Sequence, residues 1–305
     1  MIFFSYKGGQ LGNRLFTFAH LIATATANNL KVVNLSFDEY AQYFQTTRQD
    51  VFCRYPSVVS ALKSSKLRSW AFIFNKAILK LLRNLRFFES SIHLIVVADL
   101  PEYQFSEDRH FDLNAQSFRD RIKKKPVTFL FGRFFRDYHN LEKYQNVIRD
   151  FFKPLPEIQA SVNQFIDQAR RNTDLLVGVH IRRGDYEQFA NGKYFYSQKE
   201  YATKMKELQA NVIGKKIAFL LCSDEEIKSG PFEGLIFCRG PGHLVKDMYA
   251  FSQCDLILGP PSTFTLWASF YGQKPLYQMK DLNDPINLKS FAILPPQILY
   301  NFSFN

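Results

Sequence analysis

The sequence predicts an α/β fold built from two Rossmann-like domains that face a central cleft. Apolar stretches of strand length alternate with helical patterns along much of the chain, and continuous apolar strands separated by helices indicate a buried parallel sheet. A chain of 305 residues is long enough for two domains. Two prolines make residues 153–156 the best linker candidate, because proline stops a helix and stiffens the connection. We therefore place one domain at 1–153 and the other at 154–305.

The N-terminal domain opens in the order strand, glycine turn, helix and strand, which is typical of doubly wound sheets. The turn lacks the G-x-G-x-x-G spacing, and no clear acidic ribose ligand follows it at the expected distance, which disfavours a nicotinamide cofactor. The predicted strands of this domain are 1–6, 31–35 and 126–135, and the predicted helices are 15–28 and 141–152.

Residues 66–88 form a basic amphipathic pattern, in which six Lys and Arg and no acid are interleaved with apolar residues. One interpretation is a helix that packs on its own domain and leaves a basic face in solvent. A second is a surface that touches anionic lipid, since such helices bind membrane interfaces in this way. A third is contact with nucleic acid.

The sequence of the C-terminal domain predicts a regular alternation of helices and strands. Ligands of open α/β sheets bind beyond the carboxyl ends of the strands, so the loops that follow three of these strands are the candidate binding loops. The predicted strands are 175–181, 216–222, 235–237, 255–258 and 275–277, and the predicted helices are 157–172, 197–211, 244–253 and 262–271.

The first of these loops carries the sequence H-I-R-R-G-D-Y at residues 180–186. Strand alternation puts His180 and Arg182 on one face and turns Arg183 elsewhere. A guanidinium at a strand end can hold a phosphate through two hydrogen bonds and stays charged. The alternatives are that one arginine pairs with Asp185 inside a tight turn, and that His180 is a buried structural histidine.

The second and third loops add polar groups of the kind that nucleotides require. Asp224 follows the second strand and could accept hydrogen bonds from a base or ribose, or could cap the next helix. Ser262 and Thr263 lie at the start of a predicted helix, where N–H groups suit a phosphate; ordinary capping by Ser262 is the alternative. Together the three loops indicate a pocket for a diphosphate nucleotide.

Composition limits the partners. A formal net charge of +11 favours anionic ligands such as nucleic acid, phosphate-bearing small molecules or an acidic membrane face. An aromatic content of 16% fits either a Phe-rich core or sugar-stacking surfaces. The four cysteines form no C-x-x-C pair and, like the histidines, show no metal-site spacing, so reduced thiols and no metal are expected. A strand at the very start leaves no room for a signal peptide, and we expect a cytoplasmic protein.

The motifs together resemble the α-1,2-fucosyltransferases, glycosyltransferase family 11, over residues 2 to about 280. The N-terminal turn is similar to the family's G-G-L-G-N-Q-L/M-F, residues 180–186 match H-I-R-R-G-D-Y throughout, and Ser223-Asp224 falls at F-S-D-D. The remaining matches are Asp247-Met248, Cys254, Ser262-Thr263-Phe264 and Trp267 to the family's D-M…C…N-S-T-F-S-W-W block, and residues 132–144 to G-Y-W-Q-S-E-K-Y-F.

This resemblance implies a GT-B fold and an inverting, metal-independent transfer of L-fucose from GDP-fucose to a glycan hydroxyl, the 2-OH of a galactoside. Arg182 would hold the β-phosphate with support from His180 and Arg183, and preorganised cations commonly supply most of the stabilisation of such a leaving group. Asp224 would contact the nucleotide. Ser262, Thr263 and Phe264 would line the phosphate and sugar, and Asn13 would face the donor sugar. Asp185 and Glu187 are the candidates for the base, and Asp185 could instead orient the arginines.

The chain departs from the family pattern at five positions, most of which flank the donor and acceptor clefts. We therefore keep two alternatives: a glycosyltransferase that uses another GDP-sugar or makes another linkage, and a non-catalytic polyanion binder. The leading hypothesis expects a glycan or lipid-linked acceptor of surface polysaccharide synthesis, peripheral contact with the anionic inner membrane face, and no nucleic acid. The departures are Gln10, Arg14, Phe135, Pro261 and Leu266.

Overall fold

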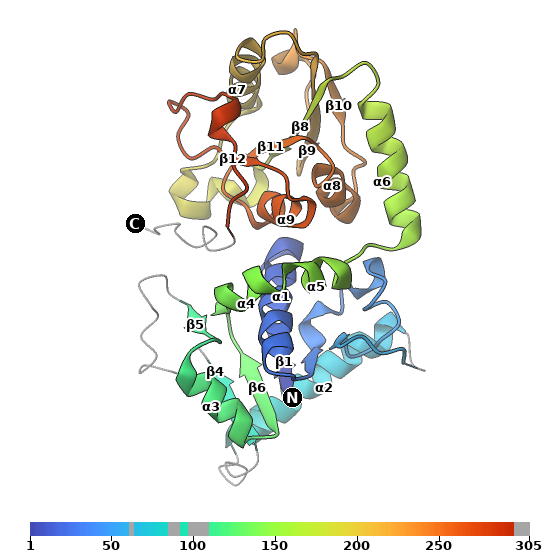
Figure 1. The fold of residues 1–305 in the computed structure, drawn as a ribbon, viewed down its shortest axis with the longest axis vertical. Coiled ribbons are helices and arrows are strands. Elements are labelled where there is room, and N and C mark those ends of the chain that lie inside the picture. The colour runs from blue at the N-terminus through green and yellow to red at the C-terminus, as the bar shows by residue number, and fades with distance from the viewer. Residues whose placement is uncertain (61–63, 85–91, 97–109, 296–305) are drawn as a thin grey trace. The chain divides into compact units, whose positions relative to one another are not determined.

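The computed structural model describes residues 1–60, 64–84, 92–96 and 110–295. The chain divides into two compact units, Met1–Leu155 and Pro156–Asn305, so the division falls two residues after the predicted one. Each unit contains its own mainly parallel five-stranded sheet (Figure 1). The predicted α/β class is confirmed.

The sheet of the first unit has the order β3-β2-β1-β6-β4, with β1 in the centre. All neighbours pair in parallel except β2 and β3, which are antiparallel. The strands are β1 (Ile2–Phe4), β2 (Val32–Asn34), β3 (Arg54–Tyr55), β4 (Ile92–Val96) and β6 (Val127–Phe131), and a separate small sheet pairs β5 (Phe111–Asp112) with β7 (Phe135–Arg136). The predicted strand 126–135 is thus wrong in its second half, because residues 132–134 leave the sheet.

The helices of this unit differ from the prediction in two places. α1 begins at Leu11, four residues early, because Gly12 and Asn13 belong to its first turn and not to the glycine turn. The predicted helix 141–152 is two short helices that meet at Tyr144. The helices are α1 (Leu11–Ala27), α2 (Ser65–Asn84), α3 (Gln116–Lys124), α4 (Tyr138–Lys143) and α5 (Gln145–Phe151).

Phenylalanine fills the core of this unit. The ring of Phe18 lies 5.4 Å from that of Phe37 and 5.5 Å from that of Phe152, at steep angles typical of edge-to-face packing. All three side chains are fully buried. Much of the aromatic excess of the sequence is therefore core.

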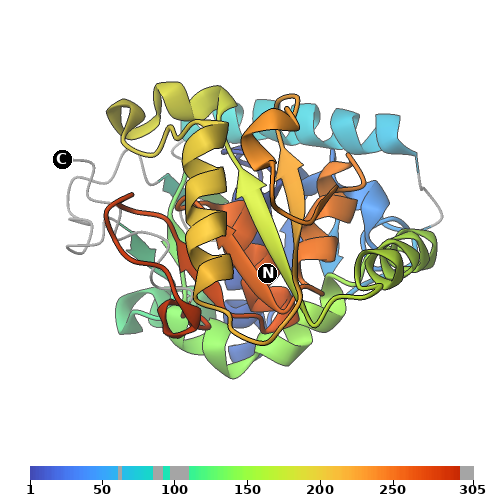
Figure 2. The ribbon, with the colours of Figure 1, turned by 90° about the horizontal axis from the view of Figure 1, so that it is seen from above.

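The sheet of the second unit is entirely parallel, with the order β10-β9-β8-β11-β12. α7 covers one face of it, and α8 and α9 lie on the other (Figure 2). β10 begins two residues later than predicted because Leu235 turns back to bond Phe232. The strands are β8 (Leu175–Ile181), β9 (Ile217–Ser223), β10 (Phe237–Arg239), β11 (Leu256–Gly259) and β12 (Leu276–Gln278), and the helices are α6 (Pro156–Ala169), α7 (Gln198–Ala210), α8 (Leu244–Phe251) and α9 (Thr263–Gly272).

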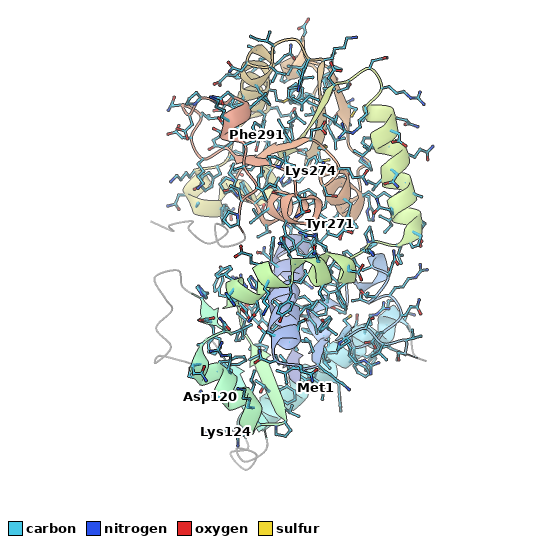
Figure 3. The ribbon with its side chains drawn as sticks, viewed as in Figure 1. Met1, Asp120, Lys124, Tyr271, Lys274 and Phe291 are labelled. Atoms are coloured by element: carbon cyan, nitrogen blue, oxygen red, sulfur yellow. The ribbon has the colours of Figure 1, made fainter. Side chains whose placement is uncertain are left out.

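Helices α8 and α9 pack closely at their carboxyl ends. The ring of Tyr271, labelled in Figure 3, lies 4.6 Å from that of Tyr249. α9 ends one residue later, at Gly272, and Gln273 follows in a left-handed conformation. Among the described residues, no helix is both long enough and apolar enough to cross a membrane.

Candidate functional site

The three predicted loops of the second unit meet at one edge of its sheet. β8 lies between β9 and β11, and all three strands end at that edge. Two contacts join the loops: the Arg183 amide donates to Asp224 Oδ1 at 3.0 Å, and the Tyr186 hydroxyl donates to the Pro261 carbonyl at 2.5 Å. Asp224, Arg183 and the segment that leads into α9 therefore form one connected constellation.

Arg182 is held by two carboxylates. Its Nη2 lies 2.6 Å from Asp185 Oδ1, and its Nη1 lies 3.2 Å from Asp224 Oδ2. The guanidinium carbon also lies 5.7 Å from the centre of the Tyr186 ring. The pairing of an arginine with Asp185 in the turn, which the sequence left open, is thus present. An incoming phosphate has to share or replace these carboxylates.

Arg183 takes other partners. Its Nη1 donates to the Tyr196 carbonyl at 2.8 Å, and its Nε lies 2.7 Å from Glu225 Oε1. Its guanidinium carbon lies 4.3 Å from the centre of the Phe195 ring. These contacts fasten the segment before α7 to the loop after β9. The role of Arg183 in nucleotide binding stays a prediction.

Asp224 organises the arginine loop as well as lying beside it. It accepts a hydrogen bond from the Arg183 amide and pairs with the Arg182 guanidinium. A Cβ atom at Gly184 would lie only 2.5 Å from Asp224 Oδ2, so a larger residue there would displace the carboxylate. The sequence predicted Asp224 as a nucleotide ligand but did not show that it also shapes the loop after β8.

His180 is buried beneath the loop. Its ring lies 4.7 Å from that of Phe264, with a 31° angle between the planes. Burial first, and the charge of Arg182 second, lower the pKa of His180 to about 3. Its Nδ1 has no hydrogen-bond partner among the described residues. The imidazole is therefore neutral near pH 7, which fits the structural alternative and leaves the cationic role to the arginines.

Ser262 caps α9. Its Oγ accepts a hydrogen bond from the Phe264 amide at 3.1 Å, so the capping alternative is present. Tyr186 also hydrogen-bonds to the Ser262 side chain, and burial raises the pKa of that tyrosine to about 12. Thr263 and Phe264 are partly exposed at the first turn of α9. Of the two predicted hydroxyls, Thr263 is the more accessible to a ligand.

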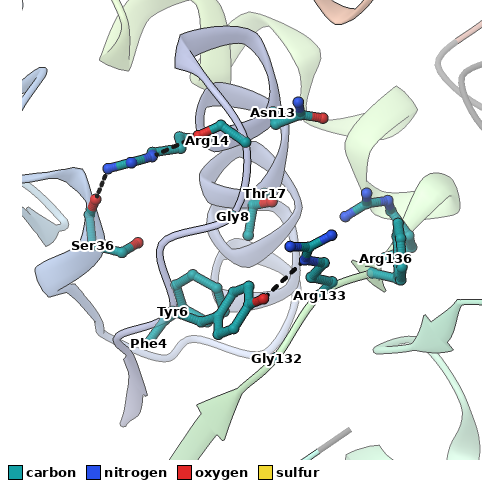
Figure 4. Close-up of a pocket in the computed structure, with 12 residues that line it drawn as sticks. Phe4, Tyr6, Gly8, Asn13, Arg14, Thr17, Ser36, Gly132, Arg133 and Arg136 are labelled. Carbon is teal, nitrogen blue, oxygen red and sulfur yellow. Dashed lines mark hydrogen bonds between the residues drawn. The ribbon is translucent and has the colours of Figure 1, made fainter. Parts of the chain in front are cut away.

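Asn13 belongs to the other unit, in the first turn of α1. It lines an open pocket (Figure 4), whose volume is about 550 Å³ when the space at its mouth is included. A Cβ atom at Gly9 would overlap the Asn13 amide, and Gly9 has a φ of +67°. The glycine turn is thus required both by backbone conformation and by the position of Asn13.

Sequence reasoning gave no role to Asp247, which lies in the first turn of α8. Its carboxylate accepts hydrogen bonds from the Gly242 amide at 3.0 Å and from the Cys222 thiol. Burial raises the pKa of Asp247 to about 6. Its place in the D-M motif was the available signal. No group of three His, Cys, Asp or Glu side chains suited to a metal ion occurs in the part of the chain that the structure describes.

Comparison with known proteins gives a family and a fold. The model of glycosyl transferase family 11 matches residues 100–279. The Caenorhabditis elegans protein named "Putative glycosyltransferase C06E1.7" is 24% identical, over 54% of this chain and 50% of that protein. The chain thus matches about half the length of this relative.

Solved fucosyltransferase structures resemble the whole chain. A mutant of Arabidopsis thaliana FUT1 in complex with GDP has a TM-score of 0.57 at 13% identity and covers 95% of this chain and 73% of its own. NodZ from Bradyrhizobium has a TM-score of 0.55 at 15% identity, with 93% and 96% covered. At such identities the likeness shows the fold alone, and the predicted GT-B-like fold is confirmed.

Proposed function

The chain belongs to glycosyl transferase family 11, and on this basis we propose that it transfers L-fucose from GDP-L-fucose to a glycan hydroxyl. The observation that carries the proposal is the constellation at the carboxyl edge of the second sheet. There Arg182, Asp224 and the first turn of α9 follow the ends of three adjacent strands, which are β8, β9 and β11. This is where open α/β sheets bind their ligands.

The donor would bind with its diphosphate at Arg182. The guanidinium stays charged, and it is positioned before the donor arrives by Asp185 and Asp224. Thr263 and the N–H groups of the first turn of α9 add donors on the adjacent loop. Among similar solved structures, that of the FUT1 mutant is in complex with GDP and one of POFUT1 is in complex with GDP-fucose. Those ligands support the choice of a guanine nucleotide.

The reaction we propose is inverting and metal-independent. The acceptor hydroxyl, the 2-OH of a galactoside, attacks the anomeric carbon as the bond to the β-phosphate oxygen breaks. Arg182 stabilises the charge that develops on the departing GDP, and a carboxylate takes the hydroxyl proton. Asp185 is the candidate base, but its ion pair with Arg182 favours an orienting role. Glu187, exposed on the same loop, is the other candidate.

Binding of guanine nucleotides tests the proposal. We expect GDP and GDP-fucose to bind the purified protein in excess EDTA, and UDP to give no heat, by isothermal titration calorimetry. GDP-mannose in the same series separates a fucose donor from another GDP-sugar. Equal binding of UDP and GDP, or no binding of any guanine nucleotide, would contradict the proposal. Salt-sensitive binding of DNA or RNA without guanine binding would favour the polyanion alternative.

We also propose a peripheral contact with the anionic cytoplasmic membrane face, where a lipid-linked glycan of surface polysaccharide synthesis would be the acceptor. α2 lies along the first unit (Figure 1), and several of its apolar side chains are exposed. Arg68 is 3% exposed and donates to the carbonyls of residues 47, 48 and 50. Trp70 and Phe74 are 70% and 69% exposed, and Leu67 and Ile73 are exposed to a smaller extent. A basic helix with exposed apolar side chains suits an anionic lipid surface.

Vesicle flotation tests the membrane contact. The wild type should float with phosphatidylglycerol vesicles and much less with phosphatidylcholine. Trp70→Ser with Phe74→Ser should lower the bound fraction at least about tenfold, because burial of each large apolar side chain contributes about 1.5–3 kcal/mol. Ile213→Ser, at a side chain 92% exposed in the second unit, is the control and should not change flotation. Equal flotation of the wild type with both lipids would rule the contact out. Equal flotation of the double variant and the wild type would also rule it out.

A further inference from the structure

The pocket of the first unit is strongly cationic. It is bounded by the carboxyl ends of β1 and β6, by the glycine turn and by the first turns of α1 (Figure 4). Its lining contains three arginines and no carboxylate. The lining residues are Phe4, Tyr6, Gly8, Gly9, Asn13, Arg14, Thr17, Ser36, Gly132, Arg133, Phe134 and Arg136.

The three arginines are not equivalent. Arg14 is already paired, because its Nη1 lies 3.1 Å from Glu39 Oε2 and donates to the Ser36 carbonyl at 2.9 Å. Arg133 donates from Nε to the Tyr6 hydroxyl at 2.8 Å, and within the described residues no ion pair joins it to a carboxylate. Arg133 is exposed. Its charge is therefore available to a ligand.

Arg136 adds a second cation, this one within the pocket wall. It is 3% exposed, and its Nη1 donates to the Phe135 carbonyl at 2.8 Å. The charge of Arg136 also acts on a neighbouring side chain. The pKa of His20 is lowered mainly by burial and secondly by Arg136. Arg136 comes from β7, and Arg133 from the turn between β6 and β7. Arg133 and Arg136 therefore place two guanidinium groups in the lining of the pocket.

Aromatic rings lie beside both cations. The guanidinium carbon of Arg133 is 5.8 Å from the centre of the Tyr6 ring, and that of Arg136 is 5.9 Å from the centre of the Phe134 ring. Aromatic faces stack on the apolar faces of sugar rings, and guanidinium groups hold carboxylates, sulfates and phosphates through paired hydrogen bonds. A bare inorganic anion would make no use of the apolar ring surface that Tyr6 and Phe134 place beside the guanidinium groups. The lining therefore matches a sugar that carries a negative group.

We propose that this pocket binds an acidic sugar of the glycan acceptor, a residue that carries a carboxylate, sulfate or phosphate group. The inference rests on the proposed transferase function, which leaves the first unit for the acceptor. It names the substrate class: an anionic glycan and not a neutral galactoside alone. Arg133 would hold the negative group, and Tyr6 and Phe134 would contact the ring.

Saturation-transfer NMR with simple sugars tests the proposal. Glucuronate and galactose 6-sulfate should give strong transfer from the 305-residue chain, and glucose and galactose much weaker transfer. Arg133→Gln should lower the affinity for both acidic sugars about tenfold, the effect of losing one charge-assisted contact. Because Arg133 is exposed, this variant should fold normally. Arg121→Gln, which removes a charge from α3 outside the pocket, should leave the affinity unchanged.

Three outcomes would overturn the proposal. One is equal binding of acidic and neutral sugars, and another is an Arg133→Gln variant with wild-type affinity. The third is competition, in which inorganic phosphate or GDP displaces the sugars and Arg133→Gln lowers the affinity for the competitor as much as that for the sugars. Such competition by phosphate would make the pocket a bare anion site, and competition by GDP would make it part of the donor site. GDP binding to the wild type is measured separately, so failure of the donor proposal is distinguishable from failure of this one.

Discussion

Arg182→Ala should lower the rate of fucose transfer about a thousandfold while the protein stays folded. The side chain supplies the fixed positive charge nearest the proposed diphosphate, and a methyl group cannot replace it. The loop keeps its shape, because the Arg183 amide still bonds Asp224 and Tyr186 still bonds Pro261. GDP release from GDP-fucose with a panel of galactoside acceptors gives the rate, and circular dichroism checks the fold.

Two further variants make this test specific. Arg182→Lys keeps the charge but loses the planar pair of donors, so its rate should lie between those of wild type and alanine. Lys215→Ala removes one charge just before β9, at the opposite edge of the sheet from the three loops, and should have no effect. If Arg182→Ala retains the wild-type rate, or if Lys215→Ala loses as much activity, Arg182 is not the group that stabilises the leaving GDP.

Gly272→Ala should destabilise the protein by about 3 kcal/mol, near the upper end for an overpacked core site. A Cβ atom at this position would overlap the backbone carbonyl of Ser252, at the end of α8. Backbone atoms of two packed helices cannot rotate away as a flexible side chain can. Glycine to alanine within a helix would otherwise stabilise by about 1 kcal/mol, so the expected sign is opposite to that of helix propensity.

Gly230→Ala is the matched control, because a Cβ atom there has no heavy atom within 4 Å and the residue has no positive φ. Its effect should stay within about 1 kcal/mol. Urea unfolding followed by circular dichroism compares both variants with the wild type. Equal stability of Gly272→Ala and the wild type would mean that α8 and α9 can separate without cost.

The elements that the sequence located best are those with a continuous local pattern. The predicted strand 175–181 is β8 residue for residue, since a central strand of a parallel sheet is almost continuously apolar, and only His180 interrupts the run here. The two-residue strands β3, β5 and β7 were not predicted, because so short a segment has no period. β4 was also missed, although Ile92–Val96 is mostly apolar. Short strands are defined by their partners and not by their own sequence.

In the candidate site, too, the local sequence predicted some features and the contacts between distant residues decided others. By itself the sequence determined the α/β class, the loops that carry His180, Arg182, Asp224 and Ser262, and a basic amphipathic pattern over 66–88, of which residues 85–88 lie outside the described part of the chain. Only the tertiary structure decided how these residues are used. Asp224 and Asp185 were found to hold Arg182, and burial was found to keep His180 neutral. Ion pairing and desolvation depend on neighbours from other strands, which local sequence does not specify.

The direction in which α2 faces was also decided by the fold. Its sequence pattern predicted a helix with its basic face in solvent and left contact with lipid or nucleic acid open; in the structure Arg68 is buried and bonds three carbonyls, while Trp70 and Phe74 are exposed. The cationic pocket has the same origin. The parallel pairing of β1 with β6 brings the turn after residue 131 beside the one before α1, so that Tyr6 and Arg133, 127 positions apart, share one hydrogen bond. Sequence determined which groups are present, and long-range pairing of strands determined which of them meet.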